Sequence, residues 1–154
     1  MNAYGVCQLH VTFHTKFSKP VLPEAHEELL YSYMAGVLKE HYCHPIQIGG
    51  YDDHIHAFFD LGRKITISDA VGKLKSNSSR WLSDSELYPD FEGWQRGYGY
   101  FSVSASRRQQ TIGYIAAQRY KHGRHMTFRQ EVKRFLELYG VEYDEAYLPE
   151  EYEG

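Results

Sequence analysis

The alternation of apolar and polar side chains predicts a strand near the start of the chain. In residues 7–17 (CQLHVTFHTKF), Cys7, Leu9, Val11 and Phe13 alternate with polar residues. Successive side chains of a strand point to opposite faces, so this segment is expected to be half-buried, with His10 and His14 on its polar face. Residues 24–43 change to a helical period, and their apolar positions are Leu29, Leu30, Tyr33, Met34, Val37 and Leu38.

The rest of the pattern predicts two more strands over 44–50 and 54–61, a helix over 66–83 and a fourth strand over 97–106. Gly49-Gly50 and Asp52-Asp53 indicate a turn or bulge between the second and third strands. Two further helices are expected at about 107–121 and 127–139. The order of the first six elements predicts an α+β protein: a ferredoxin-like split βαβ antiparallel sheet with two helices on one face and additional C-terminal helices. The sheet's other face is left for those last helices, a ligand or a partner.

No repeat and no long linker divides the sequence, so residues 1–154 are expected to form a single domain. The formal net charge is −3, and six of the acidic residues lie in a C-terminal tail at about 142–154 that has no basic ones. Residues 1–141 carry 17 basic and 14 acidic side chains, a net charge of +3, which permits a phosphate-containing partner. The two cysteines, Cys7 and Cys43, fit a reducing cytosol, and no signal peptide or membrane span is predicted.

Two histidines stand out in the third strand, YDDHIHAFFD at 51–60. Strand periodicity puts His54 and His56 on one face, and a pair of imidazoles held side by side is a common way to bind a metal ion. The alternative is a pair of structural histidines that are hydrogen-bonded on the sheet. Asp52 has the parity to share their face as an extra ligand or supporting partner, whereas Asp53 is expected to point away.

A candidate third ligand lies in the helix TIGYIAAQRYKHG at 111–123. Tyr114 and Gln118 are four residues apart and therefore share one helical face. A glutamine oxygen can ligate a metal, and a phenol can act as a nucleophile; packing is the alternative role for the tyrosine. Tyr120 is a poorer nucleophile candidate, because the residue four positions beyond it is Arg124.

Together, DHIH, LKSNSSRW, WQRGYGYFSVSAS, YIAAQ and EYDEAYL resemble the small single-tyrosine transposases of the HUH superfamily, which include the REP-associated tyrosine transposases. HUH denotes two histidines around a hydrophobic residue, here His54, Ile55 and His56. The resemblance extends over most of the chain, from the first predicted strand to Tyr147. It implies an enzyme that cuts and rejoins single-stranded DNA.

The resemblance also implies the roles of individual residues. His54, His56 and Gln118 would hold one divalent ion, Mg²⁺ or Mn²⁺, and the ion would polarise the scissile phosphate. Tyr114 would attack the phosphorus, leaving a 5′-phosphotyrosine link and a free 3′-hydroxyl. Because the covalent link retains the bond energy, a second 3′-hydroxyl can reverse the step on another strand.

The family resemblance implies single-stranded DNA hairpins at mobile-element or repeat ends as partners, in the prokaryotic cytosol and at the nucleoid. It also implies a homodimer in which the tyrosine helix of one subunit completes the histidine site of the other. Gly99, residues 102–106 and Arg107-Arg108 offer a hinge for that exchange, or form an ordinary polar turn. Trp94, Tyr98 and Tyr100 are stacking candidates, with the core as the alternative location for Trp94 and Tyr100. The candidate DNA-binding residues are Lys73, Lys75, Asn77, Ser78, Arg80, Arg107 and Arg108.

Three other functions remain open from the sequence. A metal-dependent phosphohydrolase of the histidine-triad kind needs a further histidine at the next alternate position, where this chain has Phe58. A domesticated hairpin-binding protein with little strand transfer is compatible with the same fold. A replication or relaxase-type HUH nuclease usually has helicase or second-tyrosine modules, for which this chain is too short.

Overall fold

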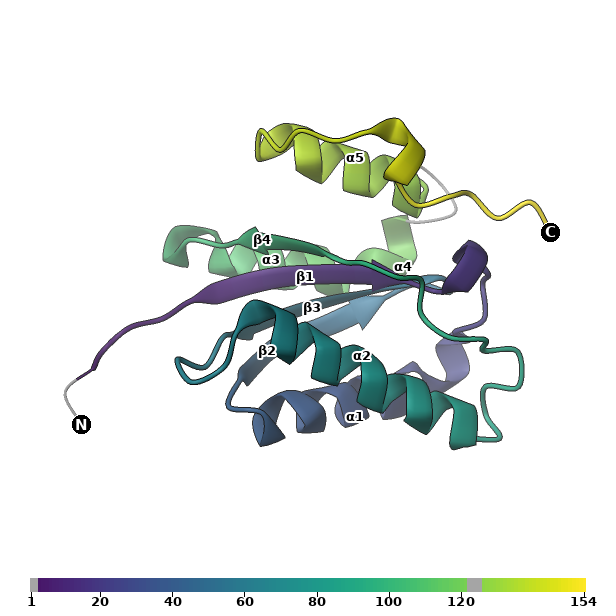
Figure 1. Cartoon of the computed structure of the whole chain (residues 1–154), viewed down its shortest axis with the longest axis horizontal. Coiled ribbons are helices and arrows are strands. Elements are labelled where there is room, and N and C mark those ends of the chain that lie inside the picture. Colours follow the sequence, from purple (N-terminus) through teal and green to yellow (C-terminus); the bar gives the residue numbers. More distant parts are fainter. Residues whose placement is uncertain (1–2, 122–125) are drawn as a thin grey trace.

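A four-stranded antiparallel sheet in the order β2–β3–β1–β4 forms the centre of the protein (Figure 1). The computed structural model describes residues 3–121 and 126–154. The strands are β1 (Gln8–His14), β2 (His44–Gly50), β3 (His54–Asp60) and β4 (Gly99–Ser102). The helices are α1 (Glu27–Glu40), α2 (Ile67–Asp84), α3 (Arg108–Ala116), α4 (Gln118–Lys121) and α5 (Phe128–Leu138). The predicted α+β class and ferredoxin-like arrangement are confirmed.

Helices α1 and α2 cover one face of the sheet (Figure 1). The odd-numbered side chains of β1 and β3 point to this face and pack against apolar residues of the two helices. This packing follows from the sequence pattern, because alternation gives the strands one apolar face and helical spacing gives each helix an apolar stripe that packs on it. The core of this layer includes Val11, Phe13, Ile55, Ala57, Phe59, Leu30, Met34, Leu38, Val71 and Leu74.

The opposite face of the sheet is also covered. Helix α5 lies on that side in Figure 1, and α3 packs against β2 and β3. His10 and Thr12 of β1 are consequently buried, at 3% and 2% exposure, so the prediction of a half-buried first strand is wrong. The polar side chains of this face lie between the sheet and the C-terminal helices.

Gly49 allows α3 to approach the sheet closely. A Cβ atom built on Gly49 would lie 2.5 Å from the carbonyl oxygen of Ile115 in α3, too close for any side chain. Gly49 is paired with His56 in the β2–β3 ladder. The close approach of Gly49 and Ile115 therefore places α3, which carries Tyr114, next to β3, which carries the two histidines.

Several boundaries differ from the sequence predictions. The expected strand over 97–106 is limited to Gly99–Ser102, and the expected helix over 107–121 is divided at Ala117 into α3 and α4. The register irregularity of β2 lies between Pro45 and Gln47 instead of at the two glycines. Leu29 is 53% exposed, so its assignment to the buried face of the first helix is wrong. In the described parts of the chain, no helix is both long and apolar enough to cross a membrane.

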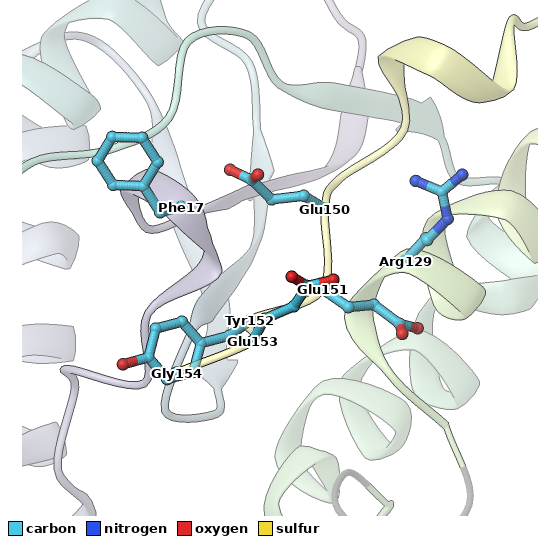
Figure 2. A pocket seen from close by; sticks show the side chains of 7 residues that line it. All are labelled: Phe17, Arg129, Glu150, Glu151, Tyr152, Glu153 and Gly154. Carbon is cyan, nitrogen blue, oxygen red and sulfur yellow. The ribbon is translucent and has the colours of Figure 1, made fainter.

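The acidic C-terminal segment folds back along the body of the protein. The Arg129 guanidinium donates hydrogen bonds to the carbonyl oxygens of Pro149 and Glu145, at 3.1 and 3.0 Å. The Ser18 hydroxyl donates to the Glu150 carbonyl oxygen at 2.5 Å. Figure 2 shows the resulting shallow pocket, which the last five residues line together with Phe17 and Arg129.

Candidate metal and nucleophile site

His54 and His56 are fully buried on the face of β3 that lies under α3 and α5. The Nδ1 atom of His54 lies 2.6 Å from Oδ1 of Asp53, and the Nδ1 atom of His56 shares a hydrogen bond of 2.7 Å with Nε2 of His10. Partners at Nδ1 fix the orientation of both rings. The two Nε2 atoms are left facing the same space.

The side chain of Asp53 points towards His54, whereas the sequence predicted that it points away from the histidines. Strand alternation holds only within a regular strand, and Asp53 lies in the bend before β3 begins at His54. Its carboxylate can therefore turn back to its neighbour. Burial lowers the pKa of His54, but Asp53, Glu131 and Gln118 together raise it by more, so the net pKa is raised.

Gln118 and Tyr114 reach the same space from the other side. Oε1 of Gln118 lies 3.1 Å from Nε2 of His54, and Gln118 is 1% exposed. The rings of Tyr114 and His56 are perpendicular, with centroids 5.9 Å apart. The structure thus brings together Tyr114, His54, His56 and Gln118, the four residues that the sequence proposed for chemistry, within one chain.

Glu131 of α5 joins these four residues and was missed from the sequence. Its Oε1 atom lies 2.8 Å from Nε2 of His56 and 3.5 Å from Nε2 of His54. Its Oε2 atom accepts hydrogen bonds from the Tyr114 hydroxyl and from Nε2 of Gln118, the latter at 3.0 Å. The carboxylate is 1% exposed, so it lies at the centre of the site.

The local sequence explains why Glu131 is buried. Helix α5 begins with a capping box in which Thr127 and Gln130 satisfy each other's backbone amides. This start fixes the helix rotation so that Phe128, Glu131 and Phe135 fall on one face, three and four residues apart. A carboxylate within an apolar stripe of a helix is unusual. This feature of the sequence could have identified Glu131 as a candidate site residue.

Burial and charge make Tyr114 hard to ionise in this arrangement. Burial raises the pKa of the phenol, and the negative charge of Glu131 raises it further. His10, beneath the site, is affected in the opposite direction: burial, followed by the neighbouring His56, lowers its pKa to about 3. His10 therefore stays neutral, and a nearby positive charge would oppose the rise in the pKa of Tyr114.

The donor atoms fit a divalent cation. His54 has an acceptor carboxylate at Nδ1 and two acceptor oxygens, from Gln118 and Glu131, near Nε2. These acceptors on both sides are satisfied either by a protonated imidazole, which has two N–H groups, or by an imidazole that donates to Asp53 and binds a cation through Nε2. One ligand atom each from His54, His56 and Glu131 lie within 4.8 Å of one another, and a cation there would satisfy the ring nitrogens and the oxygens together.

Arg119, in α4, holds the segment that carries Gln118 against other parts of the chain. Its guanidinium donates to Oε2 of Glu27 at 2.7 Å and to Oδ1 of Asp52 at 2.5 Å, and also to the Leu22 carbonyl oxygen at 3.1 Å. Asp52 is thus bound to Arg119, not to the histidines whose face it was expected to share. Since Asp52 directly precedes Asp53, the contact links Gln118 and His54 through their chain neighbours.

The predicted DNA-contact residues do not form one group. Five of them lie on α2, on the side of the sheet opposite the histidines, where Lys73 and Arg80 are exposed. Ser78 is fully buried and accepts a hydrogen bond from Nε1 of Trp94 at 3.0 Å, so it does not reach the surface. Lys75 donates to backbone oxygens of Gln95 and Gly97, at 2.8 Å each. Asn77 donates to the Lys73 carbonyl oxygen at 2.9 Å.

The remaining predicted contacts lie beside β4 and α3. Arg107 is exposed and Arg108 is half-buried at the start of α3. Tyr98 and Tyr100 are 38% and 53% exposed with ring centroids 6.0 Å apart, as residues available for stacking would be. Trp94 packs edge-on against Phe13 at 4.8 Å and is partly buried against the core.

Comparisons with known proteins agree with the fold and identify the family. The family model for IS200-like transposases matches residues 3–118. No curated protein matches the sequence. A candidate transposase from Deinococcus radiodurans R1 has the same fold, with a TM-score of 0.61 and 21% identity over 77% of this chain and 95% of that chain. A REP-associated tyrosine transposase bound to a REP hairpin gives a TM-score of 0.59 and 14% identity over 80% of this chain and 75% of that one. These identities show the fold alone, whereas the family model spans more than half of the sequence, including Tyr114 and Gln118. The chain belongs to the family of IS200-like transposases.

Proposed function

We propose that this chain cuts and rejoins single-stranded DNA through a covalent bond between Tyr114 and a 5′-phosphate. The observation that carries the proposal is the convergence of the Tyr114 hydroxyl, Gln118 and the Nε2 atoms of both HUH histidines on the carboxylate of Glu131. A nucleophile, two imidazoles and a proton acceptor thus lie within one buried site.

The two oxygens of Glu131 suggest a division of roles. Oε2 accepts the hydrogen bond of the Tyr114 hydroxyl and is placed to take its proton. The phenolic oxygen then forms a bond to phosphorus, and the bond from phosphorus to the 3′-oxygen breaks. The 3′-oxygen takes up a proton, from the protonated Glu131 or from water, and leaves as a free hydroxyl. In the reverse step a 3′-hydroxyl attacks the phosphotyrosine, and the tyrosine oxygen recovers its proton.

We assign His54, His56 and Gln118 as ligands of one divalent cation, Mg²⁺ or Mn²⁺, with Oε1 of Glu131 available as a fourth protein ligand. When bound, such an ion supplies positive charge that polarises the phosphate and favours the ionised phenol. Asp53 and His10 orient the two imidazoles from behind. The mixed set of nitrogen and oxygen donors suits Mn²⁺ at least as well as Mg²⁺.

The proposed substrate is a single-stranded DNA hairpin at the end of a mobile element or repeat. The solved REP-associated transposase of the same fold is bound to a REP hairpin, which supports this choice. The DNA cleavage and rejoining would take place in the cytosol, at the nucleoid. The homodimer with exchanged tyrosine helices stays a prediction, because here Tyr114 and Gln118 complete the histidine site of their own chain.

The test is a cleavage and binding assay on hairpin DNA with a single-stranded flank. With Mn²⁺ or Mg²⁺, the wild-type protein should form a DNA adduct that survives denaturant. His56→Ala should abolish the adduct and still bind the hairpin, because binding depends mainly on phosphates and stacking. His44→Ala, an exposed histidine of the neighbouring strand β2, is the matched control and should retain the adduct. Full cleavage by His56→Ala, or by wild type in excess chelator, would contradict the metal assignment.

A further inference from the structure

A cavity of about 540 Å³ opens beside Tyr114, between the end of β4, α3 and α5. This volume falls in the range of about 300–1,000 Å³ that is typical of small-molecule sites. Tyr114 and His10 form part of the cavity lining. The mechanism proposed above gives the rest of the cavity no role.

The rings of Phe135 and Tyr139 line the cavity, and both contact Phe101. Phe101 stacks on Phe135, with centroids 5.2 Å apart, and contacts Tyr139 at 4.9 Å. The Tyr139 hydroxyl donates to the Ser102 carbonyl oxygen at 2.9 Å, which fixes the ring, yet the side chain is 46% exposed. An ordered and accessible aromatic ring is a surface on which an unpaired base can stack.

Two arginines supply positive charge at the same cavity. Arg107 and Arg134 both line it and are exposed. Among the residues that the structure describes, neither guanidinium has an ion-pair partner. The charge of Arg134 reaches Tyr114, where it partly opposes the rise in pKa caused by burial and Glu131. Free guanidinium groups beside a nucleophile are suited to holding phosphate oxygens.

We propose that this cavity binds the nucleotide next to the scissile phosphate of single-stranded DNA. The base lies against Tyr139 and Phe135, and Arg107 and Arg134 contact the phosphates on either side of it. The inference rests on the proposed function, since Tyr114 at the cavity wall defines which phosphate is scissile. Only an unstacked nucleotide can enter, so the cavity selects single-stranded DNA over duplex.

The arrangement also suggests how the cavity is coupled to the chemistry. Glu131, Arg134 and Phe135 lie on neighbouring turns of α5, three and four residues apart. A nucleotide bound against Arg134 and Phe135 is therefore placed by the same helix that contacts the Tyr114 hydroxyl through Glu131. Binding in the cavity and alignment of the scissile phosphate would be set by one rigid element.

The experiment measures DNA binding on a Tyr114→Phe background, so its result does not depend on cleavage. The ligand is a hairpin with a single-stranded flank whose cleavage position has been mapped with wild-type protein, or, if wild type forms no adduct, a set of flanks with one abasic position each. An abasic residue at one of the two positions adjoining the scissile phosphate should weaken binding about tenfold. Tyr139→Ala should weaken binding to intact DNA by a similar factor and should remove the sensitivity to the abasic residue.

Three variants control for indirect effects. Tyr139→Phe keeps the ring and loses only the hydrogen bond to Ser102, so it should keep the sensitivity to the abasic residue that Tyr139→Ala loses. Arg134→Gln should weaken binding and reduce its salt dependence, whereas Lys133→Gln, which removes the adjacent cation that pairs with Glu145, should do neither. Circular dichroism checks that each variant is folded, and Arg134→Gln serves as the test if Tyr139→Ala does not fold.

The outcomes separate this inference from the proposed function. If no abasic position matters, or if Tyr139→Ala retains the full abasic penalty, the cavity does not hold a base. If the wild type forms no adduct but the abasic and Tyr139 effects appear, the cavity assignment stands and the proposed chemistry fails. If the adduct forms and both effects are absent, the chemistry stands and the cavity assignment fails.

Discussion

The hydroxyl of Tyr114 donates a hydrogen bond to Glu131, a residue of the next long helix, and both side chains belong to one chain. The same carboxylate lies 2.8 Å from Nε2 of His56. Helix α5 therefore contributes directly to the site, although the family match ends at Gln118, before this helix begins.

The nucleophile assignment predicts that Tyr114→Phe loses the covalent DNA adduct entirely. The substitution removes one oxygen and keeps the packing of the ring, so the fold should be retained. Tyr120, which is 75% exposed, is the control, and Tyr120→Phe should form the adduct at the wild-type rate. The readout is a denaturing gel with mass-spectrometric mapping of the modified peptide. An adduct on another tyrosine would overturn the assignment.

Glu131→Gln should slow adduct formation about a hundredfold, a typical loss when a positioned proton acceptor is removed. The amide keeps the size and much of the hydrogen bonding of the side chain but cannot take a proton. Titration of Mn²⁺ should also show weaker binding, as one carboxylate oxygen lies beside the histidines. Glu137→Gln, on the exposed side of the same helix, should behave like wild type. Equal rates in the two variants would remove Glu131 from the mechanism.

Arg119 is expected to act as a positioning residue. Arg119→Ala breaks contacts to Glu27, Asp52 and Leu22 and should lower the free energy of unfolding by about 2 kcal/mol, since hydrogen bonds to charged groups contribute about 1.5–3 kcal/mol. Adduct formation at saturating DNA should fall about tenfold while hairpin affinity is kept, because Gln118 is no longer held against His54. Arg119→Lys should restore part of the rate. A variant with reduced stability and a normal rate would show that the role is purely structural.

Subunit exchange can be tested by mixing Tyr114→Phe with His56→Ala protein. If one subunit's tyrosine helix completes the other's site, some adduct should return, because one composite site regains every part. The measurement requires verified mixed dimers, identified by different tags on the two variants. Absence of adduct in those dimers would leave the chemistry in place and assign it to single chains.

Stability should fall as the solution becomes acidic. Burial is the main reason that the pKa of His10 lies at about 3 and that of His14 at about 4. Asp53 raises the pKa of His14, and His54 and Lys75 lower it. The unfolded chain, with ordinary histidine pKa values near 6.5, binds protons first. The contribution of these two histidines to stability is therefore complete above pH 6.5 and decreases from there down to their folded pKa values, by at most roughly 1.4 kcal/mol per pH unit for each histidine.

His14→Gln removes the contribution of His14 to the pH dependence of stability. Urea unfolding at pH 7, 6 and 5 should give a shallower decrease for this variant than for wild type. The raised pKa of His54 gives a stabilisation that is complete below about pH 6.5 and is lost as the pH rises above that value, so it does not reduce the decrease between pH 6 and pH 5. A wild-type protein equally stable at pH 7 and pH 5 would contradict the neutral state of the buried His10 and the half-buried His14.

The sequence by itself determined the features that depend on local periodicity. Alternation within β3 is a property of the strand backbone, so His54 and His56 had to share a face wherever the strand was placed. In the same way, helical spacing put Tyr114 and Gln118 side by side. The order of strands and helices was sufficient for the α+β class, since each apolar face can be buried in only a few ways.

Only the tertiary structure decided which distant groups meet at those faces. Glu131 comes from a helix whose position depends on how α5 packs over the sheet, and no local rule links it to a strand 75 residues earlier. Asp53 turns towards His54 because the backbone bends before the strand begins, and Asp52 is held by Arg119 across 67 residues. Periodicity fixes the direction of a side chain relative to its own element, whereas its partners are fixed by the packing of elements that are far apart in sequence.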